Sequence, residues 1–158
     1  MPPRTQHFLP QRTFEGHAQP IIIGLDPGKV TGAAILHPTS WWTISEIDSL
    51  PALWDLLGQA RPKVVVCEKF VWQPRVHDAT ALEAIGVAKL YVQQHYDVNM
   101  IFQMPAAAKN FVSDVMLRRN DLFNVSKGMR HARDAIRHVI YYLVHVLGDK
   151  SWLEAMRG

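Results

Sequence analysis

The chain has 158 residues, of which 48% are hydrophobic, enough for a single domain with a sizeable core. Its formal net charge of +3 is mildly basic and permits a polyanionic partner such as nucleic acid. The single cysteine excludes an internal disulfide, and no apolar run approaches the ~18 residues that a membrane span needs. We therefore expect a cytoplasmic protein without a membrane partner.

The pattern of apolar residues predicts one α/β domain. Residues 1–19 are polar and proline-rich and are interpreted as a flexible arm, with the domain at 20–150 and a C-terminal tail at 151–158. Strands are predicted at 21–25, 31–36, 42–47, 64–67 and 99–104. Helices are predicted at 51–59, at 79–95, from Pro105 onward and at 131–147. This order indicates a five-stranded mixed sheet flanked by helices.

Acidic residues stand at the ends of two apolar strands and at the start of an apolar helix. Asp26 follows the first strand directly, and Glu68 follows the fully apolar stretch at 64–67. His131 and Asp134 are three residues apart and therefore share one face of the last helix. If that helix packs on the sheet, its first turn meets the two strand ends. Clustered carboxylates repel one another unless a cation balances them, and such oxygen-rich sites suit Mg²⁺ or Mn²⁺.

Each of these residues also has a purely structural interpretation. Asp26 could cap a turn, Glu68 could end a strand, and His131 could simply begin a helix. Asp134 could pair with one of the neighbouring arginines, Arg130, Arg133 or Arg137. The lone cysteine, Cys67, lies within an apolar strand and is interpreted as a small core residue, not as a nucleophile.

Three sequence motifs resemble those of the RuvC family of Holliday-junction resolvases, within the RNase H superfamily. Residues 24–32 resemble the first acidic motif, 64–68 the second acidic strand and 131–135 the C-terminal acidic helix, so the resemblance spans about residues 21–147. The compact size resembles phage members, which would place the protein in the host-cell cytoplasm. The resemblance implies an RNase H-like fold and two Mg²⁺ or Mn²⁺ ions per site. The implied metal ligands are Asp26, Glu68, His131 and Asp134.

The resemblance also implies residues that contact DNA. Family members carry an aromatic residue shortly after the second acid, and here both Phe70 and Trp72 are candidates for stacking on a base. Either ring could instead belong to the core beneath the loop. Lys109 and Lys127 resemble the family's basic residues, and Arg130 lies in the same cation-rich stretch. A solvated basic face is the alternative for this stretch.

The sequence thus predicts a metal-dependent endonuclease that resolves Holliday junctions and other branched DNA. A homodimer would match the twofold symmetry of the junction, and the family implies products with 5′-phosphate and 3′-hydroxyl ends. An RNase H-fold nuclease acting on RNA, flaps or forks stays open, as does a non-catalytic relative that binds branched DNA. Residues 24–32 also resemble the phosphate loop of actin-like and sugar-kinase ATPases. Those proteins need two such domains, and this chain has room for one.

Overall fold

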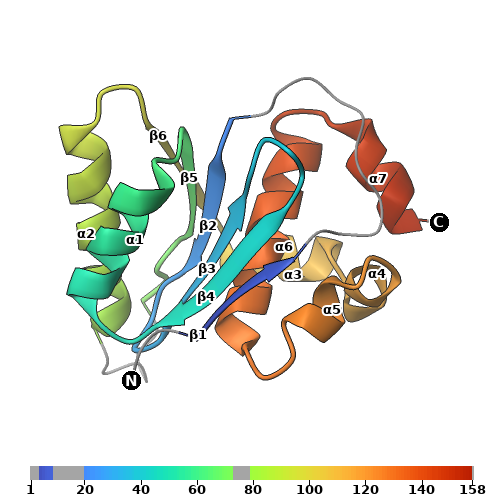
Figure 1. Ribbon diagram of the computed structural model, residues 1–158, viewed down its shortest axis with the longest axis horizontal. Coiled ribbons are helices and arrows are strands. Elements are labelled where there is room, and N and C mark those ends of the chain that lie inside the picture. Colours follow the sequence, from blue (N-terminus) through green and yellow to red (C-terminus); the bar gives the residue numbers. More distant parts are fainter. Residues whose placement is uncertain (1–3, 9–19, 73–78, 158) are drawn as a thin grey trace.

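The computed structural model describes residues 4–8, 20–72 and 79–157. Within these residues, six strands form one sheet, in the spatial order β1-β4-β3-β2-β5-β6 (Figure 1). The strands are β1 (Arg4–Phe8), β2 (Ile22–Asp26), β3 (Thr31–Leu36), β4 (Trp42–Ile47), β5 (Val64–Glu68) and β6 (Asn99–Gln103).

The strand directions bring the two acidic strand ends to one edge of the sheet. The first four strands in the order pair antiparallel, whereas β2, β5 and β6 run parallel. In the parallel register Leu25 of β2 lies beside Cys67 of β5. The next residue of each strand is an acid, so Asp26 and Glu68 emerge side by side at the carboxyl edge of the sheet.

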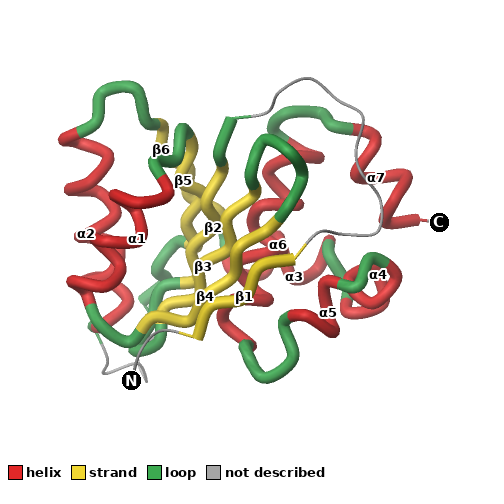
Figure 2. Tube along the Cα trace, in the orientation of Figure 1, coloured by secondary structure: helices red, strands yellow, loops and turns green. Residues whose placement is uncertain are grey.

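Helices cover both faces of the sheet (Figure 2). The first face carries α1 (Leu50–Ala60) and α2 (Thr80–Gln94), and the second carries the others. These are α3 (Pro105–Phe111), α4 (Asp114–Arg119), α5 (Leu122–Val125), α6 (Arg130–His145) and α7 (Lys150–Arg157). Among the described residues, none of the helices is both long enough and apolar enough to span a membrane.

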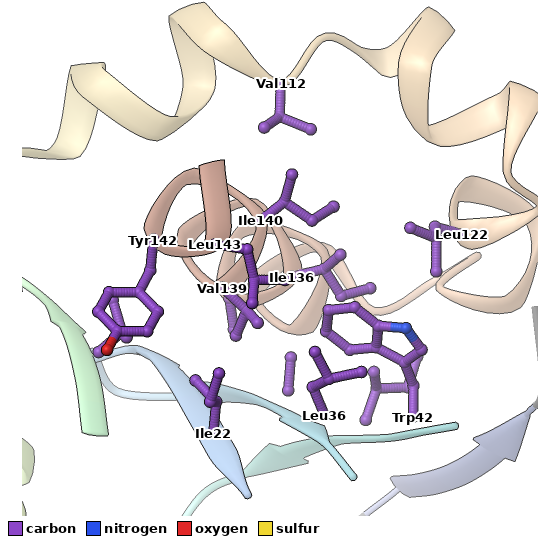
Figure 3. Close-up of a cluster of buried hydrophobic side chains, with 14 of the residues drawn as sticks. Ile22, Leu36, Trp42, Val112, Leu122, Ile136, Val139, Ile140, Tyr142 and Leu143 are labelled. Carbon is purple, nitrogen blue, oxygen red and sulfur yellow. The ribbon is translucent and has the colours of Figure 1, made fainter. Parts of the chain in front are cut away.

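The larger core lies between the sheet and α6 (Figure 3). Apolar residues at helical spacing make α6 amphipathic, and Ile136, Val139, Ile140 and Leu143 are all fully buried. Val139 packs toward Ile22 of the sheet. This packing fixes the direction of α6 and therefore fixes where its first turn meets the strand ends.

The structure corrects the expected strand count and part of the expected termini. The sheet has six strands, because Arg4–Phe8 in the supposed arm pairs with β4 along its whole length. Those residues are mostly exposed, so backbone pairing and not an apolar pattern places them. In the expected C-terminal tail, α7 inserts Trp152 edge-on against Trp42, with the ring centroids 5.8 Å apart. The remaining arm residues, 1–3 and 9–19, and loop residues 73–78 lie outside the described residues.

Candidate active site

A hydrogen bond joins the end of β2 to the first turn of α6. Nδ1 of His131 lies 2.9 Å from Oδ2 of Asp26. The Asp26 side chain is 9% exposed, whereas the imidazole is 44% exposed. The buried acid therefore lies inside the site and the histidine lies at its rim.

Two glycines allow α6 to approach the sheet closely enough for this contact. A Cβ added at Gly24 of β2 would overlap the Ala135 carbonyl and lie 2.7 Å from a Val139 methyl carbon. A Cβ at Gly32 of β3 would overlap the backbone of His131. Only glycine permits backbone and helix to approach this closely at these positions.

Glu68 is held by a buried network that joins β5, β6 and α6. Nε2 of His138 lies 2.9 Å from Oε2 of Glu68, and the imidazole is fully buried. On its other side, Nδ1 lies 2.8 Å from Oε1 of Gln103. The Gln103 amide nitrogen donates to the His138 carbonyl at 3.2 Å, which orients the amide oxygen toward Nδ1. With the amide oriented in this way, Nδ1 of His138 donates to Gln103, and Nε2 is the ring nitrogen that contacts the Glu68 carboxylate.

Asp134 faces two cations. Nη1 of Arg137 lies 2.5 Å from Oδ1, and Nζ of Lys109 lies 3.2 Å from Oδ2. Arg137 is itself fixed by the Val112 carbonyl at 2.9 Å and by an ion pair with Asp114. The interpretation of Asp134 as the partner of an arginine is thus confirmed for Arg137.

The three carboxylates are close enough to influence one another. The pKa of Asp26 is raised above its usual value, first by burial and next by repulsion from Glu68. Asp134 raises it further, while the hydrogen bond and charge of His131 oppose the shift. The structure therefore brings the acids of all three motifs into one electrostatically coupled group, beside His131.

The chemistry of this donor set fits a hard divalent cation, although its present arrangement does not form a ligand cage. Among the described residues, no group of three or more His, Cys, Asp or Glu side chains is arranged to hold a metal ion. The carboxylates face His131, His138, Lys109 and Arg137 instead. Oxygen ligands whose mutual repulsion already penalises ionisation suit Mg²⁺ or Mn²⁺, but binding requires that some of these partners exchange.

Solved structures with the same architecture place this geometry in context. Thermus thermophilus RuvC in complex with a Holliday junction substrate matches with a TM-score of 0.62 and 13% identity, over 83% of this chain and 97% of that chain. Another Thermus thermophilus RuvC structure matches with a TM-score of 0.58 and 15% identity, over 81% and 96% of the two chains. The chain has the RuvC fold. The α/β, RNase H-like architecture predicted from the sequence is therefore confirmed.

The other comparisons add little to the RuvC fold. A yeast mitochondrial Holliday junction resolvase matches with a TM-score of 0.48 and 10% identity, over 93% of this chain and 83% of that chain. No protein-family model matches the sequence, and no curated protein matches it significantly.

Glu46 is a functional candidate that the sequence analysis missed. Its Oε1 accepts a hydrogen bond of 2.9 Å from the backbone nitrogen of His131. The helix has no side-chain cap of its own, because its N-cap residue is Met129. A carboxylate from β4 therefore stabilises the positive end of α6. Only the pairing of Glu46 with Gly32 across the sheet reveals this role, and that pairing is not written in the local sequence.

The two aromatic candidates on the RuvC fold have different surroundings. Phe70 is half-buried and packs against the core beneath α1 and α2. Trp72 is 65% exposed, and its ring centroid lies 6.2 Å from that of Phe70. Phe70 therefore packs as part of the core beneath the loop, and Trp72 is the more exposed of the two rings.

The basic candidates also separate into two groups. Lys127 and Arg130 are exposed beside the first turn of α6, whereas Lys109 contacts Asp134. Arg133 is half-buried: it hydrogen-bonds Ser126 and stacks on Phe123, 3.9 Å from the ring centroid. Cys67 is fully buried, and burial raises the pKa of its thiol to about 12, which confirms a core residue.

Proposed function

We propose that the protein is a divalent-metal-dependent endonuclease that resolves Holliday junctions. The observation that carries the proposal is the convergence of Asp26, Glu68 and Asp134 at one end of the sheet, where burial and next the charge of Glu68 raise the pKa of Asp26. These acids still repel one another although each has a cation or imidazole of the chain beside it, and a bound cation would stabilise them. They would also repel DNA in a protein that only binds it. The RuvC fold, seen in Thermus thermophilus RuvC with a Holliday junction substrate, supports the choice of substrate.

The metal ligands in this proposal are Asp26, Glu68, His131 and Asp134, with two Mg²⁺ or Mn²⁺ ions per site. Such ions, when bound, activate a water molecule and stabilise the leaving oxygen of a phosphodiester. The chain itself orients the ligands: the backbone at Gly32 sets the position of His131, and His138 holds Glu68. Burial of Asp26 and Asp134 keeps their oxygens inside the site.

DNA contacts in this proposal come from exposed cations and from one exposed aromatic ring. Lys127 and Arg130 would bind phosphates beside the first turn of α6, and Lys109 would do so nearer the carboxylates. Trp72 would stack on a base that is unpaired at the centre of the junction. These phosphate-binding and base-stacking roles are proposed for these side chains because each is exposed.

The protein is proposed to act as a homodimer through α2. Leu82 and Leu90 are 46% and 48% exposed, and Gly86 lies between them at four-residue spacing on the same helical face. An added Cβ at Gly86 would meet nothing within 4 Å, so this face is open. Two subunits related by a twofold axis would place one site on each of the two strands that must be cut.

Cleavage of matched synthetic nucleic acids tests the proposal. The set contains a four-way junction, a fork, a flap, a duplex and an RNA–DNA hybrid, each with Mg²⁺, Mn²⁺ or a chelator. Paired symmetric nicks in the junction, absent with chelator and in Asp134→Asn, are the expected result. Cutting of forks and flaps as well would broaden the substrate to branched DNA in general. Cutting of the hybrid alone would contradict junction resolution.

A non-catalytic protein that binds branched DNA is the second candidate. The pairing of each carboxylate with a cation or imidazole of the chain favours it, because such a site is largely balanced without metal. Tight junction binding without cutting, in every metal tested, would support this candidate and contradict the first.

A further inference from the structure

The two oxygens of Asp134 are occupied by cations of very different mobility. Arg137 at Oδ1 has a side chain only 11% exposed and is tied to the Val112 carbonyl and to Asp114. Lys109 at Oδ2 has a side chain 41% exposed, and it lies in the last turn of the short helix α3. Arg137 is therefore a fixed part of the site, whereas the Lys109 ammonium can leave.

The contact with Lys109 prevents Asp134 from binding a metal ion through Oδ2. With a side chain 6% exposed, Asp134 offers a metal ion little except the oxygen that Lys109 now contacts at 3.2 Å. A divalent cation and an ammonium group compete for the same lone pairs of that oxygen. Asp134 can accept a metal there only after Lys109 has moved.

DNA supplies an alternative partner for Lys109. A lysine is a compact charge on a flexible stem, and it binds phosphate oxygens as readily as carboxylate oxygens. Because Lys109 is exposed beside the carboxylate group, a phosphate of bound DNA can take its ammonium without rearrangement of the backbone.

We propose that Lys109 is a positioning residue that exchanges Asp134 for a DNA phosphate and thereby couples DNA binding to metal binding. The inference rests on the proposed nuclease function and extends it. In the free protein Lys109 holds the metal affinity down, and on DNA it releases Asp134. Because binding couplings are reciprocal, the metal strengthens DNA binding through Lys109 by the same factor.

The test measures Mn²⁺ binding to the full chain by titration calorimetry at pH 8, without DNA. Lys109→Met removes the competing charge and should tighten Mn²⁺ binding about tenfold, the scale of one charged hydrogen bond. Lys109→Arg keeps a cation and should bind Mn²⁺ like the wild type. Lys127→Met is the matched control, because Lys127 is an exposed lysine and the two cations that contact Asp134 are Lys109 and Arg137. It should leave Mn²⁺ affinity within about twofold.

The second arm adds a four-way junction that carries phosphorothioate linkages at its centre to slow cutting. The junction should raise Mn²⁺ affinity in the wild type and in Lys127→Met, but much less in Lys109→Met. Thermal unfolding of each variant confirms that the fold is retained.

Three results would overturn the inference. The first is unchanged or weaker Mn²⁺ binding in Lys109→Met. The second is equal tightening of Mn²⁺ binding in Lys109→Met and Lys127→Met. The third is an equal effect of the junction on Mn²⁺ affinity in the wild type and in Lys109→Met. Failure of the proposed function is separately visible, because it appears as absence of cutting whatever the Mn²⁺ affinities are.

Discussion

Gly32 on β3 packs directly against the backbone of His131 in the first turn of α6. An added Cβ would overlap the His131 carbonyl group and lie 2.5 Å from the nitrogen of Ala132. A clash with backbone cannot be relieved by a change of rotamer. This contact therefore sets the position of the His131 imidazole, 2.9 Å from Asp26.

Gly32→Ala should destabilise the protein by about 3 kcal/mol and abolish cleavage, because α6 must move away from the sheet. Urea unfolding measures the loss. Gly58→Ala is the matched control, because Gly58 lies inside α1 with nothing within 4 Å of an added Cβ. The free energy of unfolding of this variant should rise by about 0.5–1 kcal/mol. A Gly32→Ala protein as stable as the wild type would show that the close approach is not required.

Asp26→Asn should stabilise the metal-free protein at neutral pH. The folded-state pKa of Asp26 is raised, so protonation stabilises the fold below about pH 4, and this contribution is lost as pH rises through the raised value. At pH 7 the ionised carboxylate lowers the free energy of unfolding, and asparagine removes this charge. The amide oxygen of the asparagine can still accept a hydrogen bond from His131. We expect a gain of ~1 kcal/mol, or about 2–4 °C in Tm, at pH 7 and none near pH 3. A lower Tm at pH 7 would contradict a destabilising charge.

The sequence predicted what local patterns encode. Runs of β-branched residues located β2 and β5, and helical periodicity located α6, so the acids at their ends could be placed at one edge. The partners of those acids could be found only in part. Arg137 lies three residues after Asp134 on the same helix, so the sequence already offers it as a partner. The contact of His138 with Glu68, and that of Gln103 with His138, arise only from the packing of α6 on the sheet.

Contacts between residues far apart in the sequence also explain why β1 and α7 were not predicted. β1 has no apolar face, because its residues pair through backbone at the outer edge of the sheet. The short helix α7 docks Trp152 edge-on against Trp42, a contact between residues far apart in the sequence. His138 lies one turn after Asp134 in the sequence, and only the packing of α6 on the sheet places it against Glu68.

His138→Leu should slow junction cleavage about 10-fold to 100-fold, because the variant leaves Glu68 without the group that orients it. His138→Gln, which keeps a donor near Glu68, should recover part of that loss. Single-turnover rates at saturating metal measure the effect, and weaker Mn²⁺ binding should accompany it. His145→Gln changes an exposed histidine of the same helix and should leave both quantities unchanged. Equal losses in Leu and Gln variants would indicate a packing role alone.

Trp72→Ala should weaken junction binding by ~1–3 kcal/mol, the scale of one stacked base, without lowering Tm, because the ring is 65% exposed. Phe70→Ala should lower Tm, since Phe70 packs against the core under α1 and α2. Tyr96→Ala, which changes an exposed aromatic residue just beyond the C-terminal end of α2, is the control for non-specific loss. Fluorescence anisotropy with a labelled junction and a labelled duplex measures binding. Equal weakening on both DNAs would argue against recognition of the junction centre by Trp72.

Leu90→Glu should convert the protein from dimer to monomer, because it places a charge on the exposed face of α2 that also carries Leu82. Sedimentation velocity measures the mass. A monomeric variant should still fold, but it should nick one strand of a junction at a time instead of both. Val115→Glu is the control: Val115 is 53% exposed on α4, so the added charge is equal and the α2 face is untouched. If the wild-type protein is monomeric at micromolar concentration and still makes paired nicks, then paired cutting does not require a homodimer.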